Sequence, residues 1–358
     1  MNTHVRIDRT DPGAVQEPSA ARAVKTVNLA LQGGGAHGAF TWGVLDRLIE
    51  DERVAFEGIS ATSAGAANAA VLAYGFTLGG REGARAALRN FWRRVSHAAL
   101  FSPLQPSLFD RITRNYGLEN SPGHIVFDML SRVLSPYQLN PGNYHPLRQV
   151  LEDVVDFERL RQGSAVKLFL SATNVRSGKV RIFTCKEITA DAVLASACLP
   201  FLYQAVEIDG EHYWDGGYMG NPAIFPLIYH CDTPDVVVVH VNPVTRPEVP
   251  TTARDIMNRI NEISFNSSLM REMRAIAFVS RLVADKMICD ASFKAMRMHA
   301  IAAEDVMRGL GVASKLNADW EFLTHLFEIG RERAAAWIAA SFDAVGERSS
   351  IDINERYL

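Results

Sequence analysis

The chain has 358 residues, of which 48% are hydrophobic and 22% charged, as in a globular protein with a sizeable core. Its 37 basic and 40 acidic residues leave a formal net charge of −3, so overall charge does not favour strong binding to nucleic acid or an anionic bilayer. The longest apolar run, 192–206, is interrupted by Ser196, Pro200 and Gln204. It therefore falls short of the roughly 18 residues of a membrane span. We expect a globular protein that spans no membrane and binds no nucleic acid.

The N-terminal residues 1–24 are polar and punctuated by Pro and Gly, which predicts a flexible tail. The tail has no apolar block of the kind that a secretory signal contains. The four cysteines are widely spaced without a Cys-x-x-Cys pair and are predicted to be reduced thiols. They are Cys185, Cys198, Cys231 and Cys289. These features favour a cytoplasmic location. Peripheral attachment to a membrane from the cytoplasmic side is compatible with them.

The fold is predicted to begin with an apolar strand at 27–31 that runs into a glycine-rich turn at 33–38. Apolar residues then recur with the 3.6-residue period of a helix. The opposite face of this helix is charged and is expected to face solvent. The apolar positions are Phe40, Val44, Leu45, Leu48 and Ile49, and the charged ones are Asp46, Arg47 and Glu50.

The pattern of strand, tight turn and helix repeats, with a strand predicted at 56–61 and a helix at 64–74. Two later segments, 167–172 and 235–241, are continuously apolar, as parallel strands are when both faces are covered. The sequence therefore predicts an α/β fold with a three-layer, open, mostly parallel sheet and helices on both faces.

Changes in composition divide the rest of the chain. We predict one α/β domain at 25–245, with a cap-like insertion at about 100–144 where prolines mix with aromatic residues. This cap is expected to be irregular and partly helical. Residues 246–358 are predicted to form a mainly helical extension packed on the same domain. Its expected packing residues are Ile256, Ile260, Ile263, Trp320, Leu323, Phe327 and Trp337.

The glycine-rich turn has three interpretations. A phosphate-binding loop needs Lys and Ser or Thr after Gly38, where Ala39 and Phe40 stand instead. A dinucleotide site fits the spacing of Gly33, Gly35 and Gly38, but the second strand does not end on the acidic residue that would hold the ribose. In the third, backbone N–H groups at the helix N-terminus form an oxyanion hole.

The second turn, Ala61-Thr62-Ser63-Ala64-Gly65, is similar to the Gly-x-Ser-x-Gly nucleophile elbow. Small residues at 61 and 65 let strand and helix approach closely, although alanine replaces the first glycine and adds a methyl group. Taken alone, a serine at this place is also an ordinary helix N-cap. A nucleophilic role for Ser63 requires a base that accepts its proton.

Asp215 is the candidate base. A hairpin is predicted with strands at 206–208 and 212–214 and a turn at Asp209-Gly210. Asp215 comes at the end of the second strand, where neighbouring aromatic residues would exclude water and raise its pKa. A second turn explains its position equally well.

The glycine turn, Ser63 in its elbow and Asp215-Gly216-Gly217, in this order, resemble the patatin-like phospholipase family. The segment 195–200, which ends in proline, and Asn221-Pro222 extend the resemblance. It covers about residues 27–244.

The resemblance implies an enzyme of the phospholipase A or lysophospholipase type that hydrolyses acyl esters of lipids, with no metal and no organic cofactor. Ser63 would be the nucleophile and Asp215 the base. A lipid or related acyl ester is the implied partner, with transient contact to a membrane surface; the oligomeric state stays open. The implied oxyanion hole is Gly33, Gly34, Gly35 and Ala36, and the supporting motif positions are His37, Gly38, Ala61, Gly65, Gly216 and Gly217.

Two positions depart from the family pattern. His37 stands where members usually carry Arg or Lys, and Ala61 where they usually carry Gly. We expect His37 to be cationic only at mildly acidic pH. Recognition of an anionic head group is therefore left open.

Two other functions are also open. A Ser-His-Asp esterase, thioesterase or polyester depolymerase needs a histidine after the acid. A non-catalytic lipid-binding or scaffold protein would keep the turn and the elbow for the sake of the fold. The candidate histidines for the Ser-His-Asp enzyme are His230, His240, His299 and His325, of which His240 is expected to be neutral within its buried strand.

The helix expected at 270–282 either contacts a membrane surface or, as is more common, faces the core.

Overall fold

The computed structural model describes residues 23–100, 102, 104–105, 110, 116–119, 121–288, 290 and 293–358. Apart from its last two residues, the tail predicted at 1–24 lies outside the described residues. Cys289 and part of the predicted cap lie outside them as well.

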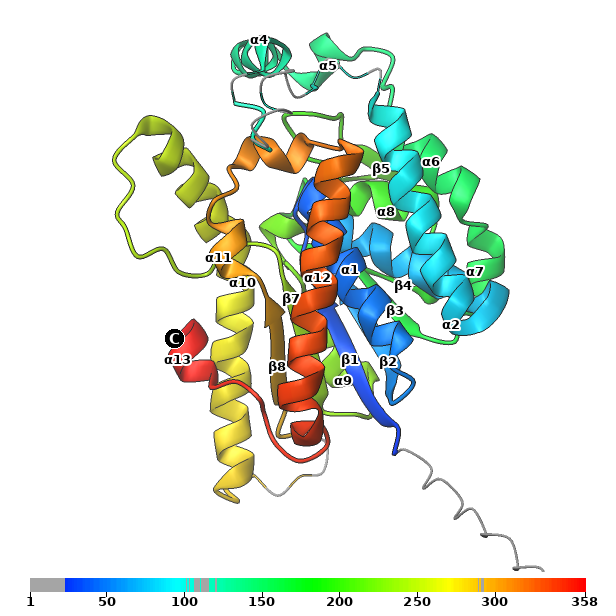
Figure 1. Ribbon diagram of the computed structural model, residues 1–358, viewed down its shortest axis with the longest axis vertical. Helices are drawn as coiled ribbons and strands as arrows, with labels where there is room; N and C mark the ends of the chain where they lie inside the picture. The colour runs from blue at the N-terminus through cyan, green and yellow to red at the C-terminus, as the bar shows by residue number, and fades with distance from the viewer. Residues whose placement is uncertain are drawn as a thin grey trace, which may run out of the picture.

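A mostly parallel sheet of eight strands forms the middle layer of the described chain (Figure 1). The strand order is β5-β6-β3-β2-β1-β7-β8, and β4 pairs with β3. The five strands from β3 to β8 in this order run parallel, whereas β4, β5 and β6 pair antiparallel. The strands are β1 (Lys25–Leu31), β2 (Val54–Ala61), β3 (Lys167–Asn174), β4 (Val180–Thr184), β5 (Val206–Ile208), β6 (Glu211–Asp215), β7 (Asp235–His240) and β8 (Arg297–Ala302).

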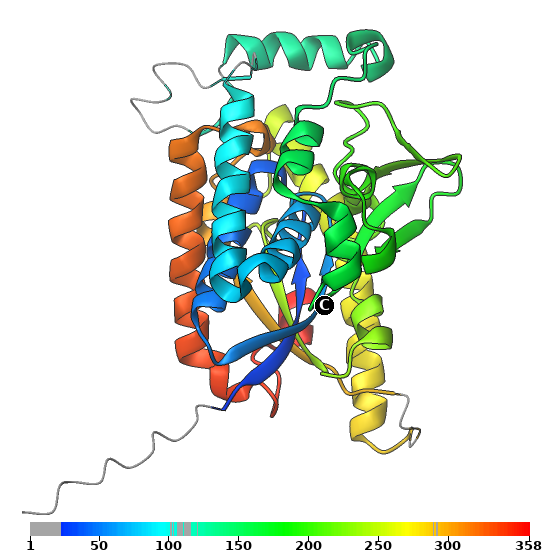
Figure 2. The same ribbon diagram turned by 90° about the vertical axis from the view of Figure 1, so that its right-hand side faces the viewer.

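Helices cover both faces of the sheet. The helices α1, α2 and α12 pack on one face, and α9, α10 and α13 pack on the other. Figure 2 shows the sheet between α12 and α10. The predicted three-layer α/β fold is confirmed. The helices are α1 (Gly38–Glu50), α2 (Ala64–Ala99), α4 (Pro122–Ser131), α5 (Pro136–Leu139), α6 (Pro146–Val154), α7 (Phe157–Gly163), α8 (Ala190–Ser196), α9 (Phe225–His230), α10 (Ala253–Ala284), α11 (Glu304–Met307), α12 (Trp320–Ser341) and α13 (Ile353–Tyr357).

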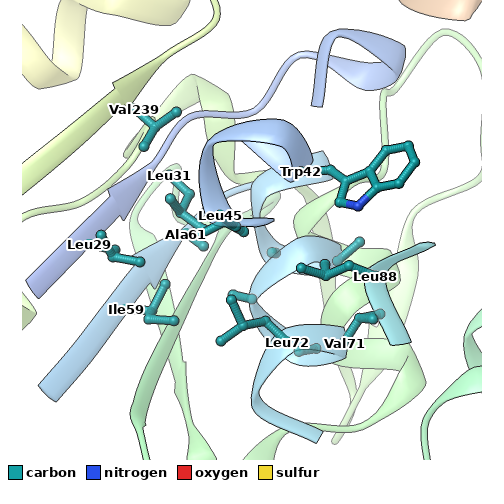
Figure 3. Close-up of a cluster of buried hydrophobic side chains, with 14 of the residues drawn as sticks. Leu29, Leu31, Trp42, Leu45, Ile59, Ala61, Val71, Leu72, Leu88 and Val239 are labelled. Carbon is teal, nitrogen blue, oxygen red and sulfur yellow. The ribbon is translucent and has the colours of Figure 1, made fainter. Parts of the chain in front are cut away.

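Alternate residues of the central strands point to opposite faces. Leu29 and Leu31 of β1, with Ile59 and Ala61 of β2, join the core under α1 and α2 (Figure 3). Ala30, between the two leucines, joins the core under α9 and α10. Burial on both faces therefore explains why these strands are continuously apolar in sequence.

One side of α1 differs from the prediction of a solvent-facing surface. Glu50 is exposed as expected, but Asp46 is only 6% exposed because α12 packs along this side of α1. Asp46 accepts a hydrogen bond from Arg85 Nε at 2.9 Å and pairs with Arg331. The two guanidinium groups compensate the buried charge.

Two other helical regions go beyond the prediction. The helix expected at 64–74 continues to Ala99, with non-helical backbone at Gly79 and Gly80. In the described part of the predicted cap, α4 and α5 are helical, and α4 has no buried residue. Figures 1 and 2 place both helices beyond one end of the sheet. The domain boundaries remain predictions.

Sequence reasoning missed the strand β8, which lies parallel to β7. Arg297 and His299 obscured its apolar pattern. Both side chains contact the buried Asp235: Arg297 Nη2 lies 2.7 Å from Oδ2, and His299 Nε2 lies 3.1 Å from Oδ1. Pairing with one carboxylate lets these two polar residues occupy a buried strand.

Of the packing residues expected after 246, Leu323, Phe327 and Trp337 of α12 are buried, and Trp320 lies against Trp42. The prediction is wrong for the N-terminal part of α10, where the expected residues lie on the side away from the core. Ile256, Ile260 and Ile263 are 41%, 55% and 54% exposed.

The segment 270–282 lies further along α10, where Met273 and Ile276 are buried. The alternative in which this segment faces the core is therefore confirmed. Among the described residues, no helix combines the length and apolarity needed to cross a membrane.

Candidate active site

The strand order brings the three predicted motifs to the same end of the sheet, at the carboxyl ends of the parallel strands. β1 and β2 are parallel neighbours with Leu31 opposite Ala61, so the glycine turn and Ser63 follow adjacent strand ends. β3 is the next parallel strand, and β6 pairs with it so that Asp215 lies opposite Ala172. The carboxyl ends of parallel strands are where open α/β sheets bind ligands.

Ser63 occupies a strained turn between β2 and α2. Its φ of 56° and ψ of −124° are rare for any residue but glycine, and such a conformation costs about 1–3 kcal/mol. Ser63 stands at the N-cap of α2, yet its side chain makes no capping hydrogen bond. Its N–H donates instead to Ser196 Oγ at 2.9 Å. The structure thus rejects the ordinary N-cap interpretation.

The small residues on either side of the elbow have different surroundings. Ala61 is fully buried, with its methyl group in the core near Leu31 (Figure 3), so the fold accommodates this departure from glycine. At Gly65, a Cβ would lie 2.6 Å from the carbonyl oxygen of Leu31. Glycine at this position lets α2 begin directly against the end of β1.

The glycine turn lies against the elbow. A Cβ on Gly33 would lie 2.6 Å from the Cβ of Ser63, so only glycine fits there. The N–H of Gly33 donates to Asn221 Oδ1 at 2.7 Å, so this residue positions the turn and does not present its amide to a ligand. The N–H groups of residues 34–36 have no hydrogen-bond partner in the described chain. They are the amides that can receive an oxyanion.

At the remaining glycines of the motifs, neighbouring segments of the chain approach too closely for a side chain to fit. A Cβ on Gly38 would lie 2.7 Å from the Cβ of Ala64, which joins the start of α1 to the start of α2. Gly216 and Gly217 follow Asp215 in a short 3-10 helix, η3 (Gly216–Tyr218). Their lack of a side chain lets this segment pack closely against Ser171 of β3 and the ring of Phe265 in α10.

Asp215 has the features of both interpretations of its sequence position, the turn residue and the desolvated base. Its Oδ1 accepts the N–H of Gly217 at 2.7 Å, so the side chain does stabilise a turn. Its Oδ2 has no hydrogen-bond partner among the described residues. Burial raises the pKa of Asp215 to about 6, and the Gly217 N–H, the Ser63 side chain and the charge of Lys315 hold it from rising further. A carboxylate with this pKa is a stronger base than an exposed one.

The side chains of Ser63 and Asp215 interact with each other, and this interaction lowers the pKa of the carboxyl group. The contact is not a well-formed hydrogen bond, since Oδ2 lacks a partner of proper distance and angle. Catalytic contacts are often loose in the absence of substrate. The hydroxyl of Ser63 and a desolvated carboxylate thus lie together, and the glycine turn packs against Ser63.

Comparison with known protein families matches residues 29–228, more than half of the chain, to "Patatin-like phospholipase". The chain belongs to the patatin-like phospholipase family. Among solved structures, it is similar to VipD from Legionella pneumophila, at 15% identity and a TM-score of 0.44, over 89% of this chain and 68% of VipD. It is also similar to the type III effector protein ExoU, at 15% identity and a TM-score of 0.32, over 89% of this chain and 54% of ExoU. It thus spans about half the length of the ExoU chain. No curated protein matched the sequence.

In this patatin-like phospholipase, His37 does not provide the charge that Arg or Lys usually supplies. It is 2% exposed, and its Nε2 lies 2.8 Å from Ser314 Oγ. Burial, together with the charge of Lys315, lowers the pKa of His37 to about 3. The expectation that His37 becomes cationic at mildly acidic pH is therefore wrong.

The four histidines considered for a catalytic triad make other contacts, and none of them has a hydrogen bond to Ser63 or Asp215 within the described chain. His240 Nε2 lies 2.6 Å from the hydroxyl of Tyr357, and burial lowers the pKa of His240 to about 3, as expected for a neutral core histidine. The other three contact residues elsewhere in the fold. His299 binds Asp235 and Ser350, His230 stacks on Phe169, and His325 stacks on Tyr116.

Sequence reasoning missed Gln32, which follows β1 directly. Its Oε1 accepts the N–H groups of Val241 and Asn242 at 3.0 and 3.1 Å, and its Nε2 donates to Asn266 Oδ1 at 3.0 Å. Gln32 thus ties the start of the glycine turn to the end of β7 and to α10. A polar side chain at the end of a buried strand was the available signal.

The structure does not support binding of a nucleotide at the glycine turn. Glu57, the acidic residue of β2, accepts the N–H groups of Asp232 and Thr233 at 2.6 and 2.8 Å and pairs with Lys167. These contacts hold it away from the glycine turn. No group of three or more His, Cys, Asp or Glu side chains suited to hold a metal occurs among the described residues.

Proposed function

We propose that this family member is a serine lipid acyl hydrolase of the phospholipase A or lysophospholipase type, with Ser63 as nucleophile and Asp215 as base. The observation that carries the proposal is the interaction of the strained Ser63 with the buried carboxyl group of Asp215, beside a glycine turn that packs against Ser63. The family assignment supports a lipid ester as the substrate class. The proposal keeps the cytoplasmic location expected from the sequence.

In the first step, Ser63 Oγ attacks the ester carbonyl carbon while its proton passes to Asp215 Oδ2. The carbonyl oxygen becomes an oxyanion and is stabilised by the N–H groups of residues 34–36. One such donor is worth about 10²–10³ in rate in other serine hydrolases. The tetrahedral intermediate then collapses, the alcohol leaves with the proton from Asp215, and the acyl group stays on Ser63.

In the second step, Asp215 accepts a proton from water as the water oxygen attacks the acyl carbon. The second tetrahedral intermediate releases the fatty acid, and the proton returns to Ser63. Because the pKa of Asp215 is about 6, the carboxyl group is ionised near neutral pH and ready to accept the proton. Charge and protons balance over the two steps through this one side chain.

We also propose that the described part of the cap contacts the lipid. The helix α4 lies beyond the end of the sheet that carries the site (Figures 1 and 2), and it has no buried residue. Met129 is 65% exposed and Val126 56% exposed. Exposed apolar surface of this kind marks sites of contact with lipid or protein.

The test is a product-resolved panel of phospholipids, lysophospholipids, neutral glycerides, acyl thioesters and polyester, with purified wild type and Ser63→Ala. Ser177→Ala is the matched control, since Ser177 lies in an exposed turn. We expect release of fatty acid by the wild type and the control, and loss of release in Ser63→Ala. If the wild type cleaves only thioesters or only polyester, the phospholipase assignment is wrong and the protein is a thioesterase or a polyester depolymerase.

Two outcomes support the other functions. Saturable lipid binding with no acyl-enzyme on Ser63 would indicate a non-catalytic lipid-binding protein. Loss of acylation in a folded variant of His230, His240, His299 or His325 would indicate a Ser-His-Asp enzyme.

A further inference from the structure

Lys315 lies in a short 3-10 helix, η4 (Val312–Leu316), well beyond the segment that matches the family. The residue as a whole is half-buried, but its ammonium group is enclosed by protein atoms. Lys315 Nζ donates to Asn242 Oδ1 at 2.8 Å and to Asn261 Oδ1 at 3.2 Å, and it lies 5.4 Å from the centre of the Phe265 ring. Enclosure lowers the pKa of Lys315 to about 8, so it carries a positive charge near neutral pH.

η4 is connected to the glycine turn in three ways, one of them through Asn242. Asn242, which accepts the bond from Lys315, donates through Nδ2 to the carbonyl oxygen of Gly33 at 2.8 Å. The carbonyl oxygen of Lys315 lies so close to Gly35, which has φ 57°, that a Cβ there would collide with it. The residue before Lys315 contacts His37. The turn is therefore held both by the side chain and by the backbone of one lysine.

The charge of Lys315 acts on two carboxylates, Glu262 and Asp215. Glu262 already has two guanidinium partners, Arg246 Nη2 at 2.6 Å and Arg259 Nη1 at 3.2 Å. Asp215 has no such partner in the described chain. Among the described residues, Lys315 is the cation whose charge lowers the pKa of Asp215.

Phe265 of α10 links Lys315 to the other half of the site. Its ring packs against Gly217, where a Cβ would collide with it, and lies 5.4 Å from the ring of Tyr218. Lys315 thus stands between the glycine turn and the segment that follows Asp215.

We propose that Lys315 is a positioning residue of the active site: through Asn242 and its own backbone it fixes the turn that presents the amides of residues 34–36, and its ammonium group supplies the positive charge that acts on Asp215. The proposal rests on the proposed function. It also assigns a source for the positive charge that His37, at the family's usual Arg or Lys position, does not provide.

Two asparagines allow a matched test of the bracing. Asn242 and Asn261 each give one amide oxygen to Lys315 Nζ, but only Asn242 continues to Gly33. Asn242→Ala should loosen the turn while the charge of Lys315 stays. Asn261→Ala should leave the turn braced, and Lys315→Met removes the side-chain contact to Asn242 and the charge but keeps the backbone contact to Gly35.

The first measurement is amide hydrogen exchange of the peptide that contains residues 32–37, which needs no activity. We expect exchange at least about tenfold faster in Lys315→Met and Asn242→Ala than in wild type, with Asn261→Ala unchanged, because local opening of the turn breaks the hydrogen bonds that protect the N–H groups of Gln32, Gly33 and His37. Equal protection in all four proteins would contradict the bracing role, whether or not the protein is an esterase. If Lys315→Met fails to fold, Asn242→Ala and Lys315→Arg carry the test.

The second measurement is the pH profile of kcat and KM with a short soluble ester. Misplaced amides should lower kcat by about 10²-fold in Asn242→Ala and Lys315→Met with little change in KM. Loss of the charge should move the acid limb of kcat to higher pH in Lys315→Met, while Asn242→Ala and Lys315→Arg keep the limb of the wild type. Besides Lys315, the Ser63 side chain and the N–H of Gly217 act on the pKa of Asp215. The titratable groups that interact with its charge are Cys198 and Tyr218, each with a pKa raised to about 12 by burial and by Asp215. All variants keep these groups.

The two proposals fail separately. Wild-type protein without esterase activity dependent on Ser63 contradicts the proposed function, and the exchange experiment still decides the bracing. If the wild type is active and folded Lys315→Met has the same kcat and the same acid limb of its pH profile, the role of Lys315 is contradicted, whereas the proposed function stands.

Discussion

Replacement of the proposed base by its neutral amide, Asp215→Asn, should stabilise the protein while it removes the activity. The ordinary pKa of an Asp carboxyl group is 3.8, and burial raises that of Asp215 to about 6. This difference corresponds to about 3 kcal/mol, because one pKa unit is worth about 1.4 kcal/mol. Asparagine keeps an oxygen that accepts the N–H of Gly217, so that hydrogen bond need not be lost.

The sign of the effect follows from linkage. The folded state binds the proton of Asp215 more tightly than the unfolded state, so stability falls as the pH rises from 3.8 through about 6. Above this window, the ionised carboxylate costs the folded wild type about 3 kcal/mol, a cost that the variant does not carry. The gain should therefore be largest above pH 6 and vanish below 3.8.

Urea unfolding of both proteins across this pH window measures the difference in the free energy of unfolding. Asp209→Asn is the control, because Asp209 is exposed in the hairpin turn with a φ of 53°, which asparagine also adopts. The control should show no such pH-dependent gain. A variant at Asp215 that is less stable than wild type at every pH, or a gain that is independent of pH, would refute the reasoning.

Three further predictions concern activity. Initial rates on a soluble ester should fall as the pH drops through about 6, because protonated Asp215 accepts no proton; a flat profile through this range would contradict its role as base. Gly33→Ala places a methyl group against Ser63 and should lower the rate of fluorophosphonate labelling at least about tenfold, whereas Gly142→Ala, which has open space around it, should label as wild type does. Met129→Asp should reduce hydrolysis of vesicle lipid but not of a soluble ester, with Met129→Leu as the control; equal loss on both substrates would argue against lipid contact through α4.

Local patterns predicted the parts of the fold whose causes are local. Buried parallel strands are apolar throughout, and Asp209-Gly210 marks a hairpin turn because both residues adopt positive φ. The elbow at Ser63 and the end of β6 at Asp215 follow from the same kind of pattern. That these ends meet depends on strand order, which the resemblance to a family supplied.

What the sequence could not supply depends on contacts between distant segments. Asp46 is buried because α12 packs on α1, and β8 was missed because its Arg297 and His299 find their partner, Asp235, on another strand. Lys315 has no local motif at all. Its relation to Gly33 runs through Asn242, and neither residue is near the turn in sequence.

The most direct test of the proposed dyad is peptide mapping of the covalent adduct formed with a fluorophosphonate, combined with the rate of its formation. We predict an adduct on Ser63 in the wild type, none on this peptide in Ser63→Ala, and slow formation in Asp215→Asn. An adduct on another residue, or equal labelling rates with and without the carboxylate of Asp215, would contradict the proposed active site.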